Sequence, residues 1–79
     1  MTEEDILSKL KTILEESLET SDLEIGRETV ARNVDGWTSI NHLEIIRKVE
    51  QGFGIKIALP ELMRMKNIGD LIDVIARKV

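Results

Sequence analysis

The sequence contains no cysteine and no tyrosine, and its only aromatic residues are Trp37 and Phe53. The lack of cysteine excludes disulfide bonds and zinc sites built on thiolates. With so few aromatic side chains, leucine, isoleucine and valine must form the interior of this 79-residue chain. No apolar run approaches the roughly 20 residues that span a bilayer. The length predicts a single domain over residues 1–79.

Basic residues are also few. The chain has 11 Lys and Arg against 15 Asp and Glu, which gives a net charge of −4 and a pI near 4.9. Nucleic-acid binding requires clustered cations, so this balance excludes it and favours basic protein partners. The acidic start over residues 2–5 is unlike a secretory signal. We therefore expect a cytoplasmic protein.

Apolar residues recur at helical spacing in most of the chain. The pattern predicts an all-α four-helix bundle, with helices at about residues 3–18, 39–53, 59–65 and 68–79. Thr2 and Asn67 are the expected caps of the first and fourth helices, with Asp70 as the reciprocal partner of Asn67. Gly52 and Gly54 are expected to mark the end of the second helix.

The bundle has a long first loop and a short third helix. In the second helix, Ile40, Leu43, Ile46 and Val49 should form the apolar stripe. The loop, at about residues 19–38, is expected to be ordered and to include a short helical turn. Its apolar side chains should tie it to the bundle: Leu23, Ile25, Val30, Val34 and Trp37.

Enzyme chemistry finds little support in these residues. His42 is the only histidine, and Ser39 lies three residues before it on the expected helix. A nucleophile and base also need an orienting group and an oxyanion hole, and neither is evident. We therefore expect no catalytic residue and no metal site, with His42 an ordinary exposed histidine.

Ser39 has another use, because it falls where the long loop meets the second helix. Its hydroxyl should be approachable there, and the unpaired N–H groups of a helix start favour a phosphate. Ser39, or Thr38 before it, is also suited to be an ordinary helix cap. Position alone favours the ordinary cap.

Three segments resemble the acyl and peptidyl carrier protein family. Residues 34–46 (VDGWTSINHLEII) are similar to its attachment segment, residues 49–57 to its second-helix end, and residues 67–71 to its fourth-helix start. The resemblance implies a four-helix, non-catalytic carrier with 4'-phosphopantetheine attached covalently to Ser39 between Thr38 and Ile40. It also implies a monomer whose partners are a phosphopantetheinyl transferase and acyl-loading and acyl-transferring enzymes.

The sequence departs from the family at the motif and on the second helix. Thr38 replaces the usual aspartate, and Ile40 replaces leucine and should still pack. The face expected to bind partners contains Asn41 where acids are common, retains Glu44 and Glu50, and gains Arg47 and Lys48. These changes favour a specialised lipid or lipid-conjugate pathway over housekeeping fatty acid synthesis, although neutral surface drift explains them equally well.

Two further questions stay open at this point. A pocket for an acyl chain could be lined by Leu59, Leu62, Met63 and Met65, although such residues are also ordinary core. An aminoacyl, peptidyl or polyketide carrier is an alternative, because Gly36 and Trp37 before the motif also occur in those relatives. An unmodified helical adaptor is a further alternative, although it would not need Ser39 at this junction.

Overall fold

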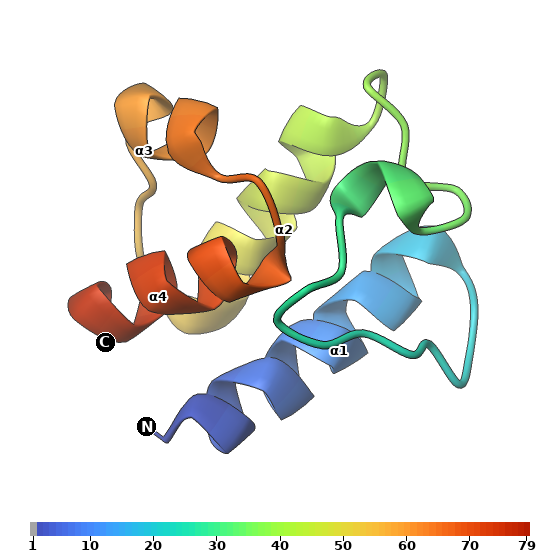
Figure 1. Ribbon diagram of the computed structural model, residues 1–79, viewed down its shortest axis with the longest axis horizontal. Helices are drawn as coiled ribbons and strands as arrows, with labels where there is room; N and C mark the ends of the chain where they lie inside the picture. The colour runs from blue at the N-terminus through green and yellow to red at the C-terminus, as the bar shows by residue number, and fades with distance from the viewer. Residues whose placement is uncertain (1) are drawn as a thin grey trace.

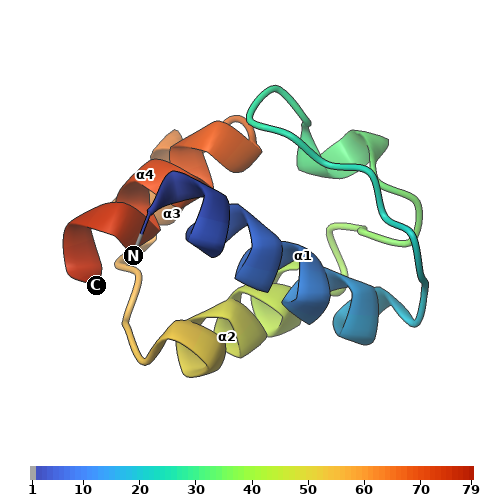
Figure 2. The ribbon, with the colours of Figure 1, turned by 90° about the horizontal axis from the view of Figure 1, so that it is seen from below.

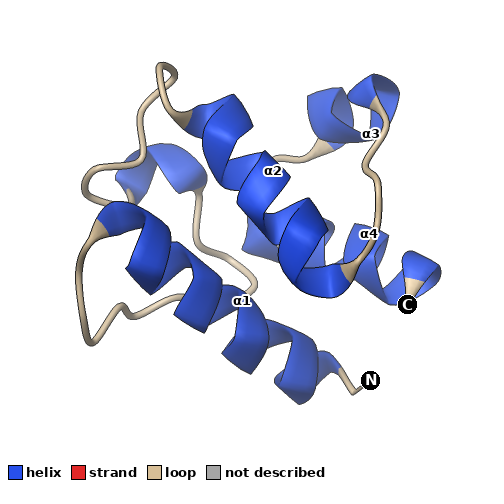
Figure 3. Cartoon of the chain, turned by 180° about the vertical axis from the view of Figure 1, so that it is seen from behind, coloured by secondary structure: helices blue, strands red, loops and turns tan. Residues whose placement is uncertain are grey.

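The computed structural model describes residues 2–79, which form helices joined by loops, with no strand in this part of the chain (Figure 3). The helices are α1 (Glu3–Leu18), η1 (Ala31–Asn33), α2 (His42–Phe53), α3 (Leu59–Arg64) and α4 (Ile68–Lys78). η1 is a single 3-10 turn. The all-α class, the four α-helices and the helical turn in the first loop are confirmed. None of the helices formed by these residues has the length and apolar character that a membrane span requires.

The helix starts follow the capping chemistry expected of them. Thr2 Oγ1 accepts a hydrogen bond from the Asp5 N–H at 3.1 Å, and the Asp5 carboxylate accepts one from the Thr2 N–H. Asn67 Oδ1 caps α4 by accepting from the Asp70 N–H at 2.9 Å. Asp70 itself binds the N–H of Lys66 at 2.8 Å, so it is not the reciprocal partner of Asn67 that we expected.

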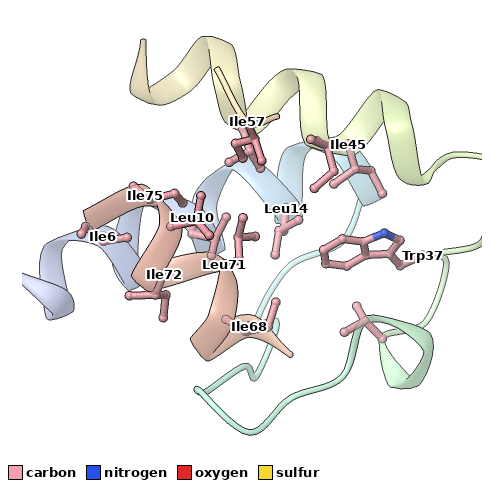
Figure 4. Close-up of a cluster of buried hydrophobic side chains, with 14 residues drawn as sticks. Ile6, Leu10, Leu14, Trp37, Ile45, Ile57, Ile68, Leu71, Ile72 and Ile75 are labelled. Carbon is pink, nitrogen blue, oxygen red and sulfur yellow. The ribbon is translucent and has the colours of Figure 1, made fainter. Parts of the chain in front are cut away.

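Helix α1 packs against both α2 and α4, and the two ends of the chain lie at the same end of the molecule (Figures 1 and 2). The core lies between these three helices and extends to the long loop through Trp37 (Figure 4). Val34 and Trp37 are buried, and Leu23 and Ile25 pack half-buried against the core, which confirms that the loop is tied down at these four residues. Val30 is half-buried but is not part of this packing. Helix α3 contributes no buried residue.

Backbone groups of the long loop complete the start of α4. The N–H groups of Ile68 and Gly69 each donate at 2.8 Å, to the carbonyl oxygens of Thr29 and Arg27. The long loop lies so close to α4 that a Cβ on Gly69 would be 2.9 Å from the Arg27 carbonyl oxygen. The Arg27 side chain also forms ion pairs with Glu3 of α1 and Asp73 of α4. The loop thereby joins the two terminal helices.

Helix α2 begins at His42 and not at Ser39, because side chains hold the preceding residues in a turn. Thr38 Oγ1 accepts from the N–H groups of Ile40 and Asn41 at 3.2 and 3.4 Å. Asn41 Oδ1 accepts from the Thr38 N–H at 2.8 Å, and its amide group donates to the Gly36 carbonyl at 2.7 Å. These reciprocal bonds hold the turn ahead of α2, whose N-cap, Asn41, makes no side-chain cap hydrogen bond to the helix.

The turn directs apolar side chains away from the core. Ile40 is 94% exposed and Leu43 is 59% exposed, whereas the buried residues of α2 are Ile45, Ile46 and Val49. The predictions that Ile40 packs and that Leu43 belongs to the buried stripe were therefore wrong.

The end of α2 depends on one of the two glycines expected there. Gly54 caps the helix in the left-handed conformation, with φ 66°, which glycine adopts readily. Gly52 lies inside α2, where a Cβ would meet the Ile13 side chain of α1. Its role is close helix packing and not helix termination.

Candidate functional site

Ser39 is exposed in the turn that leads into α2, so its hydroxyl is open to approach. Thr38 Oγ1 accepts hydrogen bonds from two backbone N–H groups of this turn. Among residues 2–79 the Ser39 hydroxyl has no hydrogen-bond partner, which leaves it available for chemistry. Neither Ser39 nor Thr38 is the N-cap of α2, which is Asn41; Thr38 holds the turn before the helix, and Ser39 is free for another role.

Trp37 and His42 form a pair beside Ser39. Trp37 is 6% exposed, which confirms its burial, and its Nε1 donates to His42 Nδ1 at 2.9 Å. The two rings stack, with centroids 5.8 Å apart. His42 is thus half-buried and engaged with the indole, and the prediction of an ordinary exposed histidine was wrong. No hydrogen bond joins His42 to Ser39 in the described part of the chain, and no metal-ligand cluster is present there.

A cleft of about 470 Å³ lies next to this pair. Its volume falls in the range of small-molecule sites, about 300–1,000 Å³. The long loop, α2, α3 and α4 all contribute to its lining: Val30, Ala31, Arg32, Trp37, His42, Ile46, Leu62, Met65, Lys66, Asn67, Ile68 and Leu71. Of the four residues expected in a pocket, Leu62 and Met65 line this cleft. The other two, Leu59 and Met63, are exposed at 64% and 78%.

The two acidic residues of the α2 face, Glu44 and Glu50, are both engaged with other groups of the protein. Glu44 lies 3.8 Å from Lys48 in an ion pair. Glu50 binds the N–H of Ile57 at 2.7 Å, so it fixes the link between α2 and α3. Arg47 is exposed and has no ion-pair partner among the described residues.

Asn41 was expected on the partner-binding face together with Glu44, Arg47 and Lys48. Its side-chain amide bonds to Thr38 and Gly36, so it holds the turn. Sequence reasoning placed Glu50 on the same face and missed its bond to the Ile57 backbone, for which the sequence carries no signal.

Helix α3, which provides the Leu62 wall of the cleft, is held by Glu61 in its first turn and by Leu62 and Met65, which pack against the core. Glu61 Oε1 accepts from the Ala58 N–H at 3.0 Å and lies 3.0 Å from Lys78 Nζ of α4. The bond from the Ala58 backbone, followed by the hydrogen bond and charge of Lys78, holds the pKa of Glu61 below its usual value. The charged form of Glu61 is therefore the one that fastens α3.

A family model described as a phosphopantetheine attachment site matches residues 8–75. The chain belongs to the phosphopantetheine attachment family. Its similar proteins include acyl carrier proteins of Thermotoga maritima, 26% identical over 96% of this chain and 94% of that protein, and of Lactobacillus acidophilus, 31% identical over 95% and 94%. A solution structure of holo acyl carrier protein from Geobacter metallireducens has a TM-score of 0.84 and 36% identity, covering 92% of this chain and 84% of that one.

Membership in the phosphopantetheine attachment family confirms the resemblance read from the sequence. It supports 4'-phosphopantetheine as the covalent cofactor and a non-catalytic carrier role. Partners of such carriers are the transferase that attaches the arm and enzymes that handle the acyl group.

Proposed function

We propose that Ser39 carries the phosphopantetheine arm and that the protein is an acyl carrier in a specialised lipid or lipid-conjugate pathway. The observation that carries the proposal is the free, exposed Ser39 hydroxyl, in a turn held by Thr38. The other serines are less suitable. Ser8 and Ser17 lie within α1, and the Ser17 hydroxyl is buried. The assignment to one domain and a cytoplasmic location both stay predictions.

The residues around Ser39 suit a phosphodiester. The first N–H groups of α2 lack acceptors within the helix, and the helix start carries partial positive charge. Ser39 precedes this helix start by three residues, with His42 as the first residue of α2. When bound, the arm supplies the thiol that the cysteine-free chain lacks, so that an acyl group can be held as a thioester.

The cleft beside Trp37 is the proposed shelter for the acyl chain. Ile46, Leu71 and Ile68 provide apolar lining, and Leu62 and Met65 come from the α3 side. Methionine adapts its shape readily, which suits a site that takes a flexible chain. Burial in such a cleft shields an acyl chain from water, with a gain of about 0.8 kcal/mol for each CH₂ group removed.

Intact mass measurement after incubation with coenzyme A and a phosphopantetheinyl transferase tests the attachment. We expect one arm on the wild type and none on Ser39→Ala, while Ser21→Ala, at another exposed loop serine, should be modified normally. An arm on Ser39→Ala, or no arm on the wild type with several transferases, would refute the assignment. Loading with acyl-activating and aminoacyl-activating enzymes then separates an acyl carrier from an aminoacyl, peptidyl or polyketide carrier.

The specialised pathway is inferred from the α2 face. Ile40 and Leu43 offer exposed apolar surface beside Ser39, and Arg47 and Lys48 place positive charge next to it. Because Lys48 neutralises Glu44 and Glu50 is bonded to the backbone, a partner with a basic docking patch meets little attraction. We expect weak association with enzymes of that kind.

A double variant tests this docking surface. Arg47→Met with Lys48→Ala removes two cations and releases Glu44, so association with a basic carrier-dependent enzyme should become severalfold faster at low salt. The gain should shrink as salt rises, since screening acts over about 10 Å at 0.1 M. Arg77→Met with Lys11→Ala removes the same two charges from α4 and α1 and should have a smaller effect. Equal rates for wild type and the α2 variant would contradict the specialised-partner proposal and leave the attachment at Ser39 intact.

A further inference from the structure

The charged residues that line the cleft are all cations. Arg32 comes from η1 and Lys66 from the link between α3 and α4, so the two approach the cleft from different segments. No acidic residue is among the lining residues. The whole chain has 15 acids against 11 bases, so the cleft is opposite in sign to the net charge of −4.

These two cations are also not neutralised by the protein. Arg27, Lys48 and Lys78 each form an ion pair with a carboxylate. Within residues 2–79, Arg32 and Lys66 form none. Asn67 adds a further donor at the same place, because its Oδ1 is used to cap α4 and its NH₂ group has no partner in the described residues. The cleft thus combines apolar walls with unpaired donors.

We propose that the acyl chain sheltered in this cleft carries a carboxylate at or near its distal end, which Arg32 and Lys66 bind. The inference rests on the proposed function, since the chain reaches the cleft from the arm on Ser39. Arg32 and Lys66 are exposed where they border the cleft, and a saturated chain offers them no acceptor. A carboxylate accepts several hydrogen bonds and gains from the two positive charges. Arg32 and Lys66 therefore set the class of acyl group.

The competing explanation is that both side chains keep their charged ends in water while their methylene stems border the cleft. Long cationic side chains often behave in this way. In that case the cleft would shelter a plain saturated chain as well as a carboxylated one. The two explanations therefore differ in the stability that they predict for a saturated and a carboxylated acyl thioester of equal length.

Two acyl groups of equal length, one with a distal carboxylate and one without, distinguish the two explanations. A transferase attaches the arm from octanoyl-coenzyme A or from the matching monothioester of suberic acid, and intact mass verifies equal loading. A loading failure would count against the proposed function, whereas the present inference is tested by the thioesters once formed. Cleavage by hydroxylamine at low salt should be about threefold or more slower for the carboxylated chain, as expected for two partly exposed ion pairs. Amide resonances of Arg32 and Lys66 should shift with that chain alone.

The variants assign the effect to the cleft. Arg32→Gln with Lys66→Gln should abolish the difference in cleavage rate between the two thioesters. Arg64→Gln with Lys56→Gln removes one arginine and one lysine that do not line this cleft, and should preserve the difference. Equal cleavage of the two thioesters in the wild type, or loss of the difference in the control variant, would overturn the proposal.

Discussion

Helices α3 and α4 both border the cleft but are held in opposite ways. In α4, six of the 11 residues are buried, whereas none of the six residues of α3 is. Helix α3 is fastened by Glu61 at its start and by Lys78, and it leaves Leu59 and Met63 exposed. One wall of the cleft is therefore built from buried residues, while the other depends on the half-buried Leu62 and Met65 and on the Glu61–Lys78 ion pair.

The largest expected effect on stability tests whether Trp37, which lines the cleft, is held as firmly in the core as α4. Trp37→Ala should lower the free energy of unfolding by about 4 kcal/mol, because it removes a buried ring. Total stability for a chain of this length is about 4–12 kcal/mol, so this variant could fail to fold. Trp37→Phe keeps most of the volume and loses the bond to His42, at a cost of about 1 kcal/mol. Urea denaturation measures both, and unchanged stability in either variant would contradict this role.

A matched pair of truncations tests the contrast between the helices directly. Ile72 of α4 is 1% exposed and Met63 of α3 is 78% exposed. Ile72→Ala should cost about 3 kcal/mol of unfolding free energy, and Met63→Ala less than about 0.5 kcal/mol. Denaturation curves measured under the same conditions provide the comparison. Similar losses for the two variants would show that α3 is part of the core after all.

A smaller effect is expected where the long loop meets α4. Gly69→Ala would place a Cβ 2.9 Å from the Arg27 carbonyl oxygen, so the backbone must shift. We expect a net loss of about 1 kcal/mol, since crowding of about 1–3 kcal/mol exceeds the gain in helix propensity. Gly26→Ala is the control, because a Cβ there meets nothing within 4 Å. Equal stability of Gly69→Ala and the wild type would mean that the loop yields without cost.

The smallest effect on global stability concerns the fastening of α3. The bond from the Ala58 backbone, followed by the contact with Lys78, lowers the pKa of Glu61 from its ordinary value of 4.5. The stabilisation is thus fully present above pH 4.5 and is lost as pH falls through the lowered pKa. The protection of the amides in residues 59–64, taken relative to the intrinsic exchange rate at each pH, should fall in that acidic range in the wild type. In Glu61→Gln this protection should be low already at pH 7.

A control separates this local event from general acid effects. Glu24→Gln, at an exposed acid of the long loop, should leave the pH response of α3 unchanged. If Glu61→Gln behaved like the wild type throughout, Glu61 would not be the group that fastens α3.

The sequence was sufficient to predict those features of the fold that depend on residues close together in the chain. The bounds of α1, its Thr2 cap and the Asn67 cap follow from residues a few positions apart. The start of α2 was misplaced because it depends on how the Thr38 and Asn41 side chains bond to backbone groups. Those bonds also reversed the expected burial of Ile40.

The candidate site likewise has one part that could be predicted from the sequence and one part that could not. Ser39 is a candidate because it lies in a segment that resembles the attachment segment of the family, and its role stays a prediction. The two cations of the cleft were missed, because Arg32 and Lys66 are brought together only by packing of the loop and the α3–α4 link. Periodicity indicates which face of a helix is apolar but does not show which distant side chains border the same cleft.

The two loop carbonyls that complete α4 have a consequence for how the protein opens. The amides of Ile68 and Gly69 are bonded to Thr29 and Arg27, so detaching the long loop exposes both amides to solvent at once. Slow hydrogen exchange at these two positions therefore measures the free energy of that local opening. Detachment of the long loop ahead of Ser39 can therefore be measured at the first turn of α4.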